Sequence, residues 1–170
     1  MFDVHRLDLA GRIRGATLLM SALAVANQCV AKEPPADLCA LLPPSEVEKV
    51  MGKPFGAAEK SKAASGTQNM VAGAQCDYHS TAGAISMTLI AFVDTSPEMA
   101  KENFKKFKMM IPAATPVSGV GEDAYMDARH AIHAVKGKVR WFISADVDEK
   151  NRAKVEQQVT DLAKFVASKL

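Results

Sequence analysis

The stretch VKGKVRWFISADV, Val135 to Val147, decides the fold class. A Lys-Gly pair stands between two apolar runs, which predicts a tight hairpin joining two neighbouring strands. After the turn, apolar and more polar residues alternate with the period of two that is typical of a strand. One face would carry Val139, Trp141, Ile143, Ala145 and Val147, and the other Arg140, Phe142, Ser144 and Asp146. Because a short hairpin joins antiparallel strands, this stretch predicts an antiparallel sheet.

The same alternation predicts two further strands, at about residues 72–80 and 84–93. Helices are predicted before, between and after the strands. The first spans about 38–51 and ends at Gly52, the second starts at Ser96-Pro97 and ends at Pro112, and the last runs to the C-terminus. We therefore predict one α+β domain, a twisted antiparallel sheet of about five to six strands packed by an N-terminal, a middle and a C-terminal helix.

Composition fits this class. The chain has 170 residues, and 48% of them are hydrophobic and 24% charged, an ordinary balance for a globular domain. The net charge of +2, with dispersed basic residues, argues against nucleic acid as a partner.

The N-terminus predicts an export signal. Three arginines precede the uncharged, mostly apolar run Gly15–Ala26, and small residues follow it. The run is shorter than the roughly 20 residues of a membrane-spanning helix. Cleavage would follow Ala26 or Ala31. A retained signal anchor or a lipidated Cys29 are the alternatives, and the only predicted routes to a membrane. We expect residues 1–31 to be the signal, 32–37 a short flexible lead-in and 38–170 the domain, located in the periplasm or secreted.

Cysteine parity favours cleavage after Ala31, because this removes Cys29 and leaves the pair Cys39 and Cys76. We predict that these two form a disulfide between the first helix and the first strand. The loop that it would close corresponds to roughly 3–4 kcal/mol in the chain-entropy model.

The segment Gly119-Val-Gly121-Glu-Asp-Ala124 matches the letters of the dinucleotide-binding fingerprint. That fingerprint requires a strand before it and a helix after it, whereas the residues that follow here have no helical stripe. Glu122 and Asp123 would also place negative charge beside a phosphate. We therefore interpret Gly119 and Gly121 as a structural turn, and no cofactor is predicted.

Catalytic and metal sites are not indicated. His130 and His133 have the spacing of helical metal ligands, but on a strand they would face opposite sides, as exposed residues. No serine lies in a Gly-x-Ser-x-Gly motif. We expect no bound metal and no enzymatic activity.

The second face of the sheet is less polar than usual. Ile90, Phe92 and Phe142 fall on it together with Arg140. Either a helix or loop of the protein covers these residues, or they form a groove or an interaction surface. They are the candidate binding face.

Three short motifs carry a family resemblance: DLCALLPPSEVEKVMGKPF, CDY and VSGVGEDAYM. Together they resemble small secreted bacterial domains of unknown function, often described as lipoproteins and similar in outline to PsbP-like domains. The resemblance implies a Cys39–Cys76 disulfide, a helix-covered antiparallel sheet and no enzymatic activity.

These observations favour an exported, non-enzymatic module that binds a protein partner or a small apolar ligand. The alternatives are an accessory subunit of an envelope assembly and a hydrolase with a concealed site. The oligomeric state is not predicted.

Overall fold

The computed structural model describes residues 33–63, 70–82, 86–146 and 149–170. The predicted export signal, with both cleavage sites, the anchor alternative and Cys29, lies outside these residues. Within them, none of the helices combines the length and the apolar character needed to cross a membrane.

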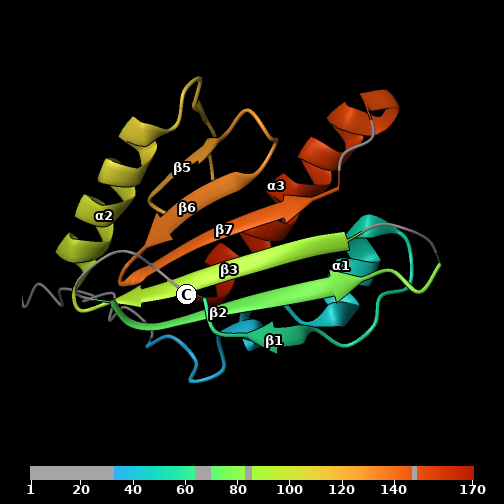
Figure 1. Ribbon diagram of the computed structural model, residues 1–170, viewed down its shortest axis with the longest axis horizontal. Coiled ribbons are helices and arrows are strands. Elements are labelled where there is room, and N and C mark those ends of the chain that lie inside the picture. Colours follow the sequence, from blue (N-terminus) through green and yellow to red (C-terminus); the bar gives the residue numbers. More distant parts are fainter. Residues whose placement is uncertain (1–32, 64–69, 83–85, 147–148) are drawn as a thin grey trace, which may run out of the picture. The chain divides into compact units, whose positions relative to one another are not determined.

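Seven antiparallel strands form a single sheet, which confirms the α+β class (Figure 1). The strands are β1 (Glu59–Ser61), β2 (Met70–His79), β3 (Ser86–Asp94), β4 (Thr115–Pro116), β5 (Asp123–Met126), β6 (Ile132–Lys136) and β7 (Val139–Ala145), in the order β1-β2-β3-β7-β6-β5-β4. The sheet has more strands than the predicted five to six because β1 and β4, only three and two residues long, are too short to show alternation. The predicted β6–β7 hairpin is present, and it turns at Gly137-Lys138, one residue beyond the predicted Lys-Gly pair.

The predicted first helix is two elements. A 3-10 turn, η1 (Leu38–Leu41), precedes the helix α1 (Pro44–Met51). Leu42, between them, is not helical, because two prolines follow it and the residue before a proline is disfavoured in the α region. Gly52 ends α1 in the left-handed conformation. The other helical elements are α2 (Pro97–Met110), η2 (Glu149–Asn151) and α3 (Arg152–Lys169).

The main core lies on one face of the sheet. Helix α3 packs against β6 and β7 on this face, and α1 packs against α3. Strand residues spaced two apart meet the apolar stripe of α3, as the alternation predicted. The largest fully buried side chains include Trp141, Tyr78, Leu89, Ile132, Ile143 and Leu162.

The Cys39–Cys76 disulfide is formed, with 5.7 Å between the two Cα atoms. It links η1 to β2 inside the core, where both cysteines are buried. Two residues further along β2, on the same face, the Tyr78 hydroxyl donates a hydrogen bond to the backbone carbonyl of Leu42. The N-terminal elements are therefore held to the sheet by a covalent bond and a buried hydrogen bond.

Helix α2 lies on the second face but covers only part of it. Ala100 and Phe104 pack on Tyr125 and Val135 over the β5–β6 side of the sheet. The β3 and β7 positions of this face lie beside the helix, and Ile90, Phe92 and Phe142 remain half-buried there.

Gly119 and Gly121 lie in the turn that leads into β5. Their φ angles are +76° and +60°. The next amide, that of Glu122, donates a hydrogen bond of 2.8 Å to the carbonyl of Val135 in β6. A strand follows the two glycines where the nucleotide fingerprint needs a helix N-terminus, so the geometry here is that of a turn.

Candidate functional site

A row of directly paired residues crosses the second face of the sheet. From β2 to β5 it consists of Gln75, Ile90, Phe142, His133 and Tyr125, each opposite the next in the strand register. We call it the central row. Tyr125, at one end, is fully buried beneath α2, while Ile90 and Phe142 are half-buried beside the helix. The row therefore runs from covered to open sheet, and its open part carries the apolar Ile90 and Phe142 and ends at the polar Gln75.

His133 occupies the middle of the row. Its ring stacks on Tyr125 with centroids 4.7 Å apart and contacts Phe142 at 4.9 Å and Phe107 of α2 at 5.5 Å. Aromatic pairs at such separations contribute about 0.5–1.5 kcal/mol beyond their area burial. The histidine is only 7% exposed. It is therefore part of an aromatic cluster that joins the covered half of the face to the open half.

Asp127 fixes the orientation of this ring. Its Oδ2 lies 3.0 Å from His133 Nε2, and its Oδ1 accepts the backbone amides of Arg129 and Ala131. Burial acts to raise the pKa of Asp127, but these hydrogen bonds outweigh it and hold the pKa below its ordinary value. Burial lowers the pKa of His133 in spite of the carboxylate beside it. A neutral ring with its proton on Nε2 follows from this arrangement.

The other ring nitrogen, Nδ1, is paired with none of the described residues. With Nε2–H donating to Asp127, Nδ1 is a hydrogen-bond acceptor in the aromatic cluster. Among the described residues, the fully buried side-chain atoms without a partner are Tyr125 Oη and Trp141 Nε1, so Nδ1 is not sealed in the core. A bound group with an N–H or O–H donor would bond to it.

Arg140 lies on the second face of the sheet, next to the apolar residues of the candidate site. It is on the same side of the sheet as Phe92, which stands opposite it in β3, and its guanidinium lies 5.1 Å from the centre of that ring. The side chain is nearly buried, and Nε donates to Asp94 Oδ2 at 2.6 Å. Asn103 of α2 donates to the other oxygen of Asp94 at 2.7 Å. The charges of Arg140 and Asp94 thus neutralise each other, which leaves no net charge beneath the apolar residues.

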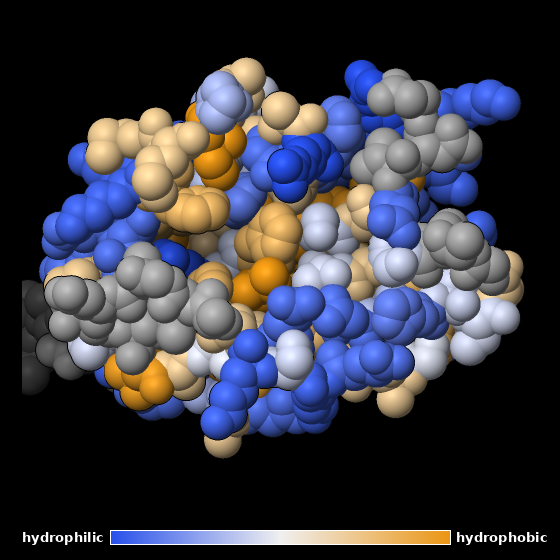
Figure 2. Space-filling model, in the orientation of Figure 1, coloured by the Kyte–Doolittle hydropathy of each residue, from blue (hydrophilic) through white to orange (hydrophobic). Residues whose placement is uncertain are grey.

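The C-terminal half of α2 forms one wall of the open part. Phe107 is 43% exposed although its ring contacts His133, and Met109 and Met110 are more exposed still. On the opposite side, Asp77 accepts hydrogen bonds from Thr88 and Gln75 at 2.7 and 2.8 Å. Figure 2 shows the resulting surface, with apolar side chains in a depression beside α2 and hydrophilic side chains over β1 and β2.

The prediction of two exposed strand histidines is wrong. His133 is in β6 but buried, and His130 is in the preceding turn with a φ of +64°, a conformation uncommon for residues other than glycine. The two do face opposite sides, since His130 Nδ1 lies 2.7 Å from Glu156 of α3. Over residues 33–63, 70–82, 86–146 and 149–170, no group of three or more His, Cys, Asp or Glu side chains could hold a metal ion.

Sequence reasoning placed Ile90, Phe92, Arg140 and Phe142 on one face, and the structure places all four there. It missed His133, Asp127 and Phe107. Alternation alone assigns His133 and Phe142 to one face, so His133 could have been included. The position of α2 could not have been read from the pattern.

Comparisons with known proteins concern the fold. No family model and no curated protein matches the chain. Among solved structures, the chain is similar to the extracellular domain of PknH from Mycobacterium tuberculosis, with a TM-score of 0.50 and 15% sequence identity over 81% of this chain and 97% of that one. At this identity the likeness shows a shared α+β fold.

Proposed function

We propose that the chain is an exported, non-enzymatic binding module that holds a small, uncharged aromatic molecule on the open part of the central row. The observation that carries this proposal is the position of Ile90 and Phe142, half-buried beside the exposed ring of Phe107 and adjacent to the acceptor on His133. Apolar residues left uncovered in a depression are typical of ligand sites.

The residues that form the open part of the central row determine which class of ligand it would bind. Aromatic and aliphatic side chains favour an apolar body, at roughly 25 cal/mol for each Å² removed from water. The paired charges of Arg140 and Asp94 offer nothing to an ionic ligand. Nδ1 of His133 favours one N–H or O–H donor. An indole or a phenol has these properties, and a charged sugar or a nucleotide does not.

The absence of enzymatic activity is part of the proposal. His133 and Asp127 have the geometry of a base and its orienting acid, but among the described residues no hydroxyl or thiol is bonded to His133. Thr88, one of the hydroxyl residues beside the row, donates to Asp77. These pairings support a binding role. Export is supported by the disulfide, which persists in oxidising compartments, and by the family of secreted domains that the sequence motifs resemble.

The proposal is tested by titrating the protein with indole and following backbone amide shifts by NMR. We expect saturable shifts at Ile90, Phe142 and His133, with dissociation in the millimolar range or tighter. Phe142→Thr should weaken binding by about fivefold or more. Val71→Thr, which removes an exposed apolar group outside the row, is the matched control and should change nothing. Absence of saturation, or equal affinity in the Phe142 variant, would contradict the proposal.

A protein partner is the second candidate, because Met109 and Met110 extend the apolar surface beyond a small ligand. This is the role of an accessory subunit in an envelope assembly. Cross-linking at native expression tests it, and recovery of the protein alone would count against it. In a partner complex Met109→Ser and Met110→Ser should reduce cross-linking.

A further inference from the structure

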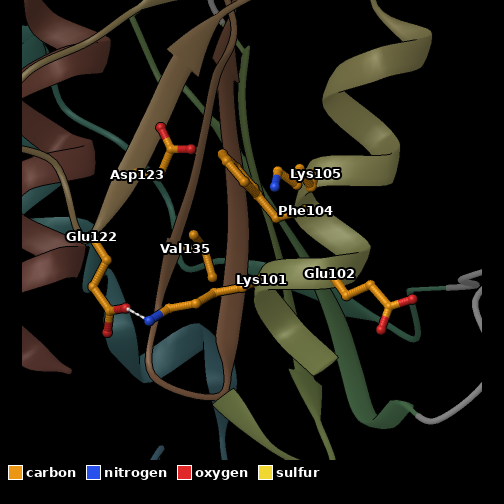
Figure 3. A pocket seen from close by; sticks show the side chains of 7 residues that line it. All are labelled: Lys101, Glu102, Phe104, Lys105, Glu122, Asp123 and Val135. Atoms are coloured by element: carbon orange, nitrogen blue, oxygen red, sulfur yellow. Dashed lines mark ion pairs between the residues drawn. The ribbon is translucent and has the colours of Figure 1, made fainter. Parts of the chain in front are cut away.

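We propose a second binding site, for a small organic monocarboxylate, between α2 and the start of β5. A cavity of about 480 Å³ lies there, lined by Lys101, Glu102, Phe104 and Lys105 of the helix, by Glu122 just before β5, and by Asp123 and Val135 of the strands (Figure 3). It shares no lining residue with the open part of the central row. Its volume falls in the range of small-molecule sites, about 300–1,000 Å³.

The inner surface of the cavity is apolar and rigid. Phe104 and Val135 belong to the small core under α2, and both are almost completely buried. The Phe104 ring is held against Tyr125, with the ring centroids 5.2 Å apart. A ligand that enters would therefore lay an apolar body on a fixed surface.

Ion pairs across the cavity fix most of its charges. Lys101 Nζ lies 2.7 Å from Glu122 Oε2, the contact drawn in Figure 3. The other carboxylate oxygen of Glu122 accepts the Gly137 amide at 2.9 Å. The hydrogen bond raises the pKa of Lys101 and lowers that of Glu122, so both groups stay ionised near neutral pH. Asp123 and Lys108 form a looser pair at 3.6 Å.

Lys105 is the exception. The remaining acid of the lining, Glu102, is bonded to Lys106 at 2.7 Å, and no described residue forms an ion pair or a hydrogen bond with Lys105. The cavity therefore combines one uncompensated ammonium with an apolar floor. Figure 3 shows Phe104 and Lys105 extending from α2 into the same space.

These features define the ligand class. A single carboxylate would pair with Lys105 while an aromatic or short aliphatic body contacts Phe104 and Val135. A second negative charge would meet the carboxylates of Glu122 and Asp123 on the opposite wall, which disfavours dicarboxylates and phosphates.

The test uses the disulfide-bonded protein and phenylacetate, followed by backbone amide shifts. We expect saturable shifts centred on Phe104 and Val135. Lys105→Gln should raise the dissociation constant about three- to tenfold. Lys53→Gln removes an exposed lysine that does not line the cavity and pairs with none of its acids, and should change it less than twofold. The neutral analogue phenylacetamide should bind Lys105→Gln and the unmodified protein equally, and inorganic phosphate should not bind.

Three outcomes would overturn the proposal. The first is that phenylacetate causes no saturable amide shifts. The second is that the two lysine variants lose affinity equally, which would indicate a general charge effect. The third is that Phe142→Thr abolishes phenylacetate binding, which would place the anion on the central row. This proposal can fail or succeed separately from the indole site, because phenylacetate should shift the amides of Phe104 and Val135, whereas indole should shift those of the central row.

Discussion

Replacing Gly121 with alanine tests the turn between β4 and β5. A Cβ at this position would lie 2.5 Å from the Val135 carbonyl oxygen and 3.0 Å from Cη2 of Trp141. The carbonyl belongs to a paired strand and cannot yield without disturbing the sheet. The φ of +60° costs an L-residue about 1–2 kcal/mol, and overpacking of this kind about 1–3 kcal/mol. We expect Gly121→Ala to lower the free energy of unfolding by about 2–5 kcal/mol.

Gly119→Ala is the matched control. Its φ is also positive, at +76°, but the nearest atom to an added Cβ is Lys164 Cε at 3.9 Å, an ordinary contact. This variant should lose about 1–2 kcal/mol, from backbone conformation alone. Urea unfolding, followed by circular dichroism and by the fluorescence of the single tryptophan, Trp141, measures both variants. Equal destabilisation would refute the reasoning from the close approach of Val135.

Three further predictions concern stability. Cys39→Ala with Cys76→Ala removes a cross-link over a sequence separation of 37 and should cost about 4 kcal/mol in urea unfolding, and an unchanged midpoint would contradict this. Asp94→Ala leaves the nearly buried Arg140 without its carboxylate and should cost about 3 kcal/mol, whereas the exposed Asp146→Ala should cost less than half of that. Because burial lowers the pKa of His133, the unfolded chain takes up its proton at a higher pH than the folded chain, so stability is complete above about pH 6.5 and falls below it. His133→Gln should flatten this part of the pH profile and His79→Gln, at an exposed position, should not.

Alternation predicted most of the sheet because period-two patterns depend only on which face is buried. Residues such as Cys76, Leu89 and Trp141 are buried where the pattern placed them. The hairpin at Gly137 and the end of α1 at Gly52 were also predicted, because both need a backbone conformation that glycine adopts easily.

The remaining features depend on tertiary contacts. Strands β1 and β4 are strands only because longer neighbours pair with them. His133 is buried because α2 lies over β5 and β6. The sequence pattern does not predict where α2 packs. Its partner, Asp127, lies in a turn six residues earlier, where an aspartate is commonly a local cap. The apolar strand residues of the candidate site could therefore be predicted from the sequence. The position of α2 beside them and the pairing of Asp127 with His133 could not.

The most direct test of the central claim is the position of bound indole relative to the central row. Intermolecular nuclear Overhauser effects should connect indole protons to the side chains of Ile90 and Phe142, and the Nδ1 resonance of His133 should shift as it accepts a hydrogen bond. The account predicts both signals, and predicts that Phe142→Thr removes them. Overhauser effects to the α3 side of the sheet, or an unchanged Nδ1 resonance at saturation, would contradict it.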